Sequence, residues 1–262
     1  MSADGRNWVL LNAAPDLRQQ IEQTPVLHPN GAIRSSPIAA VVLTGGDVDA
    51  IAGLLTLRER QAFGIYATAR VHDVLEANPI FEVLSRDLVA RHAVALDEPR
   101  ALALPSGEES GLSVELFAVP GKVPLYLERG GVPEIETNDQ TVGVAVSDGA
   151  ATLFYIPGCA AMSPALAERL RGAACVMFDG TLWTDEEMVV AGLGPKTGAR
   201  MGHMSISGPT GTLAAFEGLG VRRRILIHLN NSNPVLLDDS PERATVEAAG
   251  WEVAFDGMEL SL

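Results

Sequence analysis

The chain has 262 residues, of which 47% are hydrophobic and 5% aromatic, and it carries a formal net charge of −14. This acidic balance repels phosphate backbones and argues against nucleic acid as a partner. With no apolar stretch long enough for a bilayer, no secretory-signal pattern at the start, and Cys159 and Cys175 in apolar segments, we expect a cytoplasmic protein without membrane insertion.

The first third of the sequence alternates between apolar runs and helix-start signals. Continuous Val, Ile and Leu runs are typical of strands buried on both faces, and proline near a helix start favours the first turn. We expect strands over residues 8–12, 38–44 and 64–68, and helices over residues 14–23, 49–62 and 69–77.

The middle of the sequence has a weaker pattern. We expect strands near residues 93–96 and 112–119, and a long surface loop over residues 120–140, where Gly, Pro and charged residues collect. Two further strands, over residues 142–147 and 152–156, form a predicted hairpin through Asp148-Gly149.

The last third again predicts alternating elements. Ser163-Pro164 and Ser240-Pro241 each supply an N-cap and a proline at the first helical position. Thr184 and Glu187 have the spacing of a capping box for another helix. We also expect a helix over residues 207–219 and strands over residues 175–178, 224–228 and 251–255. The pattern indicates an α/β protein with two sheets flanked by helices.

Three polar residues follow apolar runs in this part of the chain. Asp179 lies in CVMFDG, His203 lies in RMGHMSISG, and His228 ends RILIH. Two imidazoles and one carboxylate can hold a divalent metal and leave coordination positions open. For Asp179 the alternative is a turn carboxylate, and for His228 a buried structural histidine. For His203 a metal ligand, a general acid or base, and a helix cap stay open.

The segment LTGGDVDAIAGLLTLRE at residues 43–59 resembles the metallo-β-lactamase motif Thr-His-x-His-x-Asp-His. Gly45 and Asp47 stand at the two leading histidine positions, Asp49 matches the aspartate, and Ala50 replaces the last histidine. Asp49 is therefore a candidate metal ligand, and a helix-starting acid is the alternative.

Five other segments resemble the coenzyme PQQ synthesis protein B family, which is metallo-β-lactamase-like: NAAPDLRQQI, FDGTLWTDEEM, KTGARMGHMSISG, LIHLNNSNPVLLDDS and FDGMEL. The resemblance runs from Trp8 to the C-terminus. It implies a four-layer αββα sandwich with two mixed β-sheets, built as a single domain over residues 1–262.

The chain departs from the family pattern at its start. The family usually begins with some forty more residues, which carry a Cys-x-Cys-x-x-Cys cluster that binds a structural zinc. We expect that a misplaced start codon shortens this sequence. Ala50 is the second departure, and it leaves the number of ligands at the active site open.

The resemblance implies a role in pyrroloquinoline quinone (PQQ) biosynthesis. The leading hypothesis is an iron-dependent oxygenase or hydroxylase that acts on the tyrosine ring of a crosslinked Glu–Tyr precursor. It implies iron(II) at the active site, with zinc as the alternative metal and no organic cofactor. A carrier that moves PQQ or its precursor toward the periplasm is the alternative, and a metal-dependent hydrolase is the second alternative.

The partner expected from the resemblance is a small, carboxylate-rich PQQ precursor. Asn230 and Asn231, directly after His228, are candidate substrate-binding residues, with turn formation as the alternative. Arg200 is a candidate receptor for a substrate carboxylate, with an isolated surface cation as the alternative. A homodimer is also expected.

Overall fold

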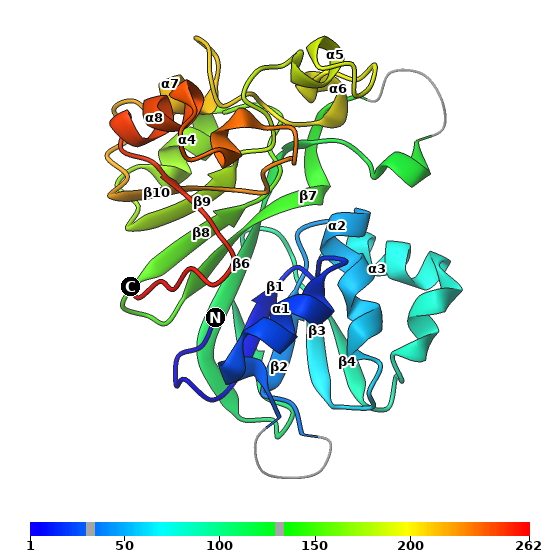
Figure 1. Ribbon diagram of the computed structural model, residues 1–262. Helices are drawn as coiled ribbons and strands as arrows, with labels where there is room; N and C mark the ends of the chain where they lie inside the picture. The colour runs from blue at the N-terminus through cyan, green and yellow to red at the C-terminus, as the bar shows by residue number, and fades with distance from the viewer. Residues whose placement is uncertain (30–34, 129–133) are drawn as a thin grey trace. The chain divides into compact units, whose positions relative to one another are not determined.

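The computed structural model describes residues 1–29, 35–128 and 134–262, which form two compact units (Figure 1). The N-terminal unit comprises Met1–Phe117, Pro124–Leu127 and Val144–Ala150. The C-terminal unit comprises Ala118–Val123, Glu128–Gly143 and Ala151–Leu262. The single domain over residues 1–262 stays a prediction.

The N-terminal unit contains a four-stranded sheet in the order β1-β2-β3-β4. Each of its three strand pairs is parallel. This sheet is therefore purely parallel, whereas a mixed one was expected from the sequence. Parallel neighbours need crossover connections, and helical segments lie in each of them. The strands are β1 (Trp8–Leu11), β2 (Ile38–Val42), β3 (Phe63–Ala67) and β4 (Val89–Ala93).

The connections of this sheet combine short α-helices with 3-10 turns. The predicted helix over residues 49–62 is wrong in extent, because only one α-helical turn forms before a 3-10 segment takes over. The predicted strand near residues 93–96 is misplaced, since β4 begins at Val89 and its polar Arg91 and His92 mask it. The helical segments are α1 (Leu17–Gln23), η1 (Pro25–Leu27), α2 (Val48–Ile51), η2 (Ala52–Leu57), α3 (Ala69–Ala77) and η3 (Pro79–Val83).

The apolar core of the N-terminal unit forms between the sheet and these helices. Leu17 of α1 and Val71 and Leu75 of α3 belong to the same buried cluster as Val41 and Ile65 of the strands. Burying each such side chain contributes about 1.5–3 kcal/mol. The helix periodicity of α3 and the continuous apolar strands therefore fix which helix face meets the sheet.

The second sheet has seven strands in the order β11-β10-β9-β8-β7-β6-β5 and is mixed, as expected. Strands β8 to β11 pair in parallel, whereas β5 and β6 are antiparallel. The strands are β5 (Arg100–Ala103), β6 (Glu109–Gly121), β7 (Glu136–Ser147), β8 (Thr152–Ile156), β9 (Cys175–Asp179), β10 (Arg223–Ile227) and β11 (Glu252–Val253).

The predicted loop over residues 120–140 is shorter in the structure. Strand β6 continues to Gly121, η4 (Leu125–Leu127) follows, and β7 already begins at Glu136. Residues 129–133 of the predicted loop lie outside the described residues. The long, polar β7 looks like a loop in sequence because its first residues, ETNDQ, carry no apolar alternation.

Of the residues that the structure describes in the C-terminal unit, five segments form short α-helices, and in Figure 1 α4, α7 and α8 lie beside β9 and β10. The helices are α4 (Pro164–Leu170), α5 (Glu187–Val190), α6 (Gly198–Met201), α7 (Thr212–Ala215) and α8 (Pro241–Ala248), and η5 (Pro234–Leu236) precedes α8. Among the described residues, no helix combines the length and apolarity that a bilayer crossing requires.

Two of the predicted helix starts are confirmed by their caps. The Ser163 hydroxyl accepts from the Leu166 amide at 3.1 Å, and the Ser240 hydroxyl accepts from the Arg243 amide at 3.0 Å. The capping box at Thr184 is wrong. Helix α5 begins only at Glu187, whose carboxylate accepts from the Trp183 amide at 2.7 Å instead.

The predicted helix over residues 207–219 shrinks to α7. Gly211 is packed so closely that a Cβ there would lie 2.1 Å from the Ser207 carbonyl oxygen. The tight turn that this contact reflects delays the helix until Thr212.

The parallel pairing of β9 with β10 positions the polar residues that follow both strands. The register places Ile227 beside Asp179, and the Gly180 amide donates to the Ile227 carbonyl oxygen at 2.8 Å. Because both strands run the same way, Asp179 and His228 leave the sheet at the same edge.

We expect Ser163→Ala to lower the free energy of unfolding by about 1 kcal/mol, because the Leu166 amide loses its cap. Urea denaturation followed by circular dichroism measures the change. Ser261→Ala, an exposed change near the C-terminus, is the control and should leave the midpoint unchanged. Equal midpoints for wild type and Ser163→Ala would contradict the capping role.

Candidate metal centre

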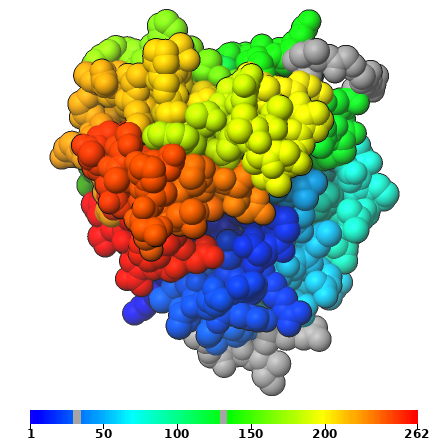
Figure 2. Space-filling view, turned by 45° about the horizontal axis from the view of Figure 1, so that its top comes forward, coloured from blue at the N-terminus to red at the C-terminus, as the bar shows by residue number. Residues whose placement is uncertain are grey.

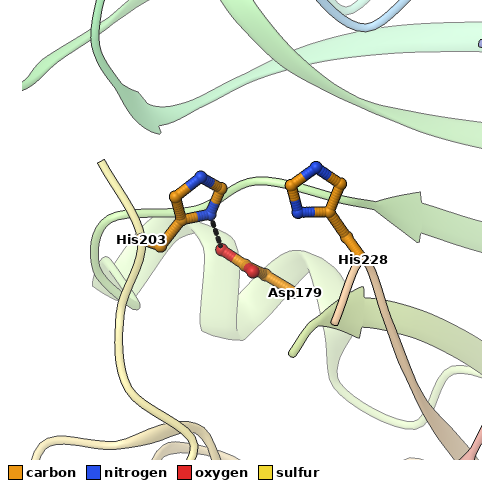
Figure 3. Close-up of side chains that lie close together, drawn as sticks. All are labelled: Asp179, His203 and His228. Atoms are coloured by element: carbon orange, nitrogen blue, oxygen red, sulfur yellow. Dashed lines mark hydrogen bonds and ion pairs between the residues drawn. The ribbon is translucent and has the colours of Figure 1, made fainter. Parts of the chain in front are cut away.

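Asp179, His203 and His228 come together in the C-terminal unit, at the edge where β9 and β10 end (Figure 3). Asp179 is the last residue of β9, His228 follows β10 directly, and His203 follows the short helix α6. One potential ligand atom from each lies within 4.8 Å of the others. The structure thus brings together three of the four residues expected to bind metal.

The Asp179 carboxylate is fully buried and holds four hydrogen bonds. Its Oδ1 accepts from the Thr181 amide at 3.0 Å and from the Thr181 hydroxyl at 2.6 Å. Its Oδ2 accepts from the Cys159 amide at 2.8 Å and from Nδ1 of His203 at 2.7 Å. A carboxylate has about four acceptor positions, so these bonds occupy its whole capacity.

Two opposed effects act on the pKa of the Asp179 carboxyl. Burial on its own raises this pKa, but the charges of His203 and His228 and the bonds from His203 and Thr181 lower it more. The net pKa lies below its ordinary value, and Asp179 is therefore a carboxylate that only accepts hydrogen bonds.

The Thr181 hydroxyl links all three residues, and its single proton determines how the imidazoles are protonated. It donates to Asp179, so it can only accept from Nδ1 of His203 at 3.0 Å and Nδ1 of His228 at 2.9 Å. Both Nδ1 atoms then carry a proton, which in a neutral imidazole leaves the lone pair on Nε2. Sequence reasoning missed Thr181, whose signal is a hydroxyl two residues after the strand-ending aspartate.

The two imidazole rings are nearly parallel, with centroids 5.3 Å apart and an angle of 18° between their planes. In Figure 3 the second nitrogen of each ring points away from Asp179, to the same side. The network therefore presents two Nε2 lone pairs together, while the carboxylate anchors His203 from behind and Thr181 anchors His228.

This donor set fits a divalent metal ion. Ligand atoms that share one ion at about 2.1 Å lie at most about 4.2 Å apart, so the three groups would have to move closer together. Because Nδ1 of His203 donates to Oδ2 of Asp179, an ion shared by all three would also require the rings to turn and the carboxylate to give up a hydrogen bond. Two imidazoles and one carboxylate suit zinc and iron(II) alike, and their chemistry does not choose between them. A carboxylate hydrogen-bonded to a ligating histidine also fixes ring orientation and raises ligand basicity.

The backbone around His228 is held in an unusual conformation. His228 has a φ of 56°, in the left-handed region that is uncommon for residues other than glycine. Two residues further along the chain, the Asn230 backbone amide donates to the Thr181 carbonyl oxygen at 3.1 Å. The buried Asn233 side chain donates to the Gly180 carbonyl oxygen at 2.9 Å. The loops after β9 and β10 are thus linked by hydrogen bonds, which fix the position of His228.

The candidate substrate-binding asparagines differ in their surroundings. The Asn230 amide group donates to the Ser232 hydroxyl at 2.9 Å and contacts Sδ of Met188 at 3.1 Å. Asn231 is exposed. The segment after β10 adjoins the α5–α6 segment on the surface in Figure 2, where the Ser232 hydroxyl donates to Glu187 at 2.6 Å. Asn230 therefore takes part in turn contacts, and substrate binding by both asparagines stays a prediction.

Asp49 lies in the N-terminal unit, in the first turn of α2. A carboxylate at that place is favoured by the helix dipole. The neighbouring Ala50 is buried in the apolar cluster of that unit. The three-residue group of the C-terminal unit does not include Asp49, whose role as a ligand stays a prediction.

We expect Thr181→Val to weaken zinc binding by about 10–100-fold, the usual effect of removing a partner that orients metal ligands. The substitution keeps the side-chain shape but removes the hydroxyl contact of both imidazoles, and only His203 keeps its bond to Asp179. Competition against a chromophoric chelator measures the affinity.

Two further variants make this test specific. Thr181→Ser keeps the hydroxyl and should bind zinc nearly as wild type does. Thr212→Val removes another buried hydroxyl, which donates to the Ser205 carbonyl oxygen at 3.3 Å, and should leave zinc affinity unchanged. Wild-type affinity in Thr181→Val would show that the hydroxyl does not hold the imidazoles.

The sequence matches the family described as Beta-lactamase superfamily domain over residues 7–229. Coenzyme PQQ synthesis protein B of Gluconacetobacter diazotrophicus is 60% identical over 262 residues, which cover 100% of this chain and 85% of the relative. The protein of that name from Xanthomonas axonopodis pv. citri is 53% identical, with coverages of 100% and 86%.

A solved structure supports the same relationship. The crystal structure of Zn(2+)-bound PqqB from Methylobacterium extorquens superimposes with a TM-score of 0.95 at 49% identity, covering 100% of this chain and 86% of that one. The metallo-β-lactamase fold with two sheets and helices, expected from the sequence, is thereby confirmed. This chain belongs to the coenzyme PQQ synthesis protein B family of the β-lactamase superfamily.

Proposed function

We propose that this chain acts in PQQ biosynthesis as an iron-dependent hydroxylase of the tyrosine ring in a crosslinked Glu–Tyr precursor. The observation that carries the proposal is the group of Asp179, His203 and His228 at one sheet edge. Two histidines and one carboxylate are typical of iron(II) sites that activate oxygen, because they leave coordination positions open. The relative from Methylobacterium extorquens is described as Zn(2+)-bound, so a metal suits the family.

Asp179, His203 and His228 would hold the iron, which when bound supplies the redox chemistry that activates oxygen. The protein contributes orientation. The Asp179 carboxylate and the Thr181 hydroxyl keep both imidazoles in the tautomer with Nε2 unprotonated. A buried anion beside two imidazoles also balances the positive charge of a bound cation.

His203 is the candidate for proton transfer. Its Nδ1 is held by Asp179 at 2.7 Å, and its side chain is 18% exposed, more than that of Asp179. An imidazole held this way by a carboxylate can accept a proton at its other nitrogen and stabilise the charge that results. When His203 is not engaged by the cation, its Nε2 can take the proton of a phenolic hydroxyl.

The proposal includes a small-molecule PQQ precursor as substrate and the cytoplasm as compartment. Cys159 and Cys175 are both free thiols in buried positions, which suits a reducing compartment.

Substrate-dependent oxygen uptake tests the function directly. The protein is purified without oxygen, loaded with iron(II), and mixed with oxygen and a dihydroxyphenyl compound while an electrode records oxygen. We expect oxygen uptake in the wild type and a slower uptake in His228→Ala. The decrease should be at least about 10–100-fold, because that is already the usual effect of mutating a residue that only orients a metal ligand.

His28→Ala is the matched control, since His28 is an exposed histidine of the N-terminal unit. It should consume oxygen like the wild type. Uptake that survives unchanged in His228→Ala, with iron bound, would refute the assignment of the metal site.

A carrier of PQQ or its precursor is the second candidate function. The observation that favours it is Ala50, which stands where the family motif has a histidine and is buried among apolar side chains. Tight binding of PQQ to metal-free protein, without oxygen uptake by the iron-loaded protein, would select the carrier over the hydroxylase.

A further inference from the structure

Two cations converge on one carboxylate in the C-terminal unit. Nη1 and Nη2 of Arg200 donate to Oε1 and Oε2 of Glu128 at 3.2 and 2.8 Å, in a bidentate ion pair. Nζ of Lys122 donates to Oε1 of the same carboxylate at 3.0 Å and to the Val123 carbonyl oxygen at 3.2 Å. The side chains of Lys122 and Glu128 are 10% and 11% exposed, and that of Arg200 is 25% exposed.

The cluster lies beside the candidate metal centre. Arg200 belongs to α6, and Gly202, the C-cap of α6, directly precedes His203. The methylene chain of Lys122 packs against this turn. A Cβ added to Gly202 would lie 3.1 Å from Cγ of Lys122. The two cations are thus fixed against the segment that presents His203.

The charges of the cluster do not cancel. Two cations and one carboxylate leave one positive charge in excess, in a chain whose formal net charge is −14. Hydrogen bonds from Arg200 and then Lys122 lower the pKa of Glu128 to about 2, so its carboxyl is ionised at neutral pH. A planar guanidinium binds a carboxylate through two parallel hydrogen bonds, and a neighbouring ammonium adds a further donor.

We propose that Lys122 and Arg200 form a binding site for the carboxylate of a small organic acid, and that Glu128 occupies this site until such a ligand replaces it. Glu128 lies outside helices and strands, directly after η4, so its side chain can leave without breaking strand pairing. An incoming carboxylate then receives the same three donors. This inference deepens the proposed function by naming the substrate group that is recognised, and rests on that function for the natural ligand.

Removing the internal carboxylate tests the site with a simple probe. Glutarate is titrated calorimetrically into metal-free wild type and Glu128→Ala. We expect Glu128→Ala to bind glutarate at least about tenfold more tightly, the effect of a charge-assisted hydrogen bond freed for the ligand. Glu128→Gln, which keeps the shape but not the charge, should show a smaller gain and serves if the alanine variant does not fold.

Glu252→Ala is the matched control. Glu252 accepts from two nitrogens of Arg223 at 2.6 and 2.9 Å, in the same bidentate way, without a lysine donor in the described contacts. It should gain no glutarate affinity, and adding Arg200→Gln to Glu128→Ala should abolish the gain.

The inference is overturned if neither Glu128 variant binds glutarate more tightly than wild type, or if Glu252→Ala gains as much. Tighter binding of inorganic phosphate than of glutarate in Glu128→Ala would overturn the carboxylate class. Because the titrations use metal-free protein and no oxygen, they succeed or fail independently of the oxygen-uptake test.

Discussion

The buried carboxylate of Asp179 is the constraint on which the site depends. A fully buried anion is costly unless its acceptor positions are filled. Here a backbone amide from Cys159, both donors of Thr181 and the ring of His203 fill them. Satisfying the anion fixes the loops that follow β8 and β9, and through the Thr181 hydroxyl it also fixes His228. The orientation of the imidazoles is thus a result of stabilising one charge in the protein interior.

The architecture supplies this constraint through parallel pairing. Strands β9 and β10 leave the sheet at one edge, and the buried Asn233 ties the loop after one to the loop after the other. The same edge carries α6, which connects the metal-binding group to the cluster of Lys122, Glu128 and Arg200. The candidate metal centre and the proposed carboxylate site therefore share one short segment of the chain.

Much of this arrangement could be predicted from the sequence, for a physical reason. Strands buried on both faces appear as apolar runs, so the ends of β9 and β10, and with them Asp179 and His228, were predictable. Thr181 and Glu128 were not, because a hydroxyl or a carboxylate gains its role from the direction of its side chain in the folded state. Helix α5 begins later than its predicted capping box and α7 is shorter than predicted, since tertiary contacts of Glu187 and Gly211 override local helix signals.

The left-handed backbone conformation at His228 is unfavourable for a residue that carries a side chain. Glycine adopts this conformation without steric cost, whereas an L-residue with a side chain costs roughly 1–2 kcal/mol there. For the backbone conformation alone, glycine would be the better residue, because it lacks the Cβ atom that causes the strain. The imidazole is thus tolerated against the local conformational preference, an outlier of the kind that clusters at functional sites.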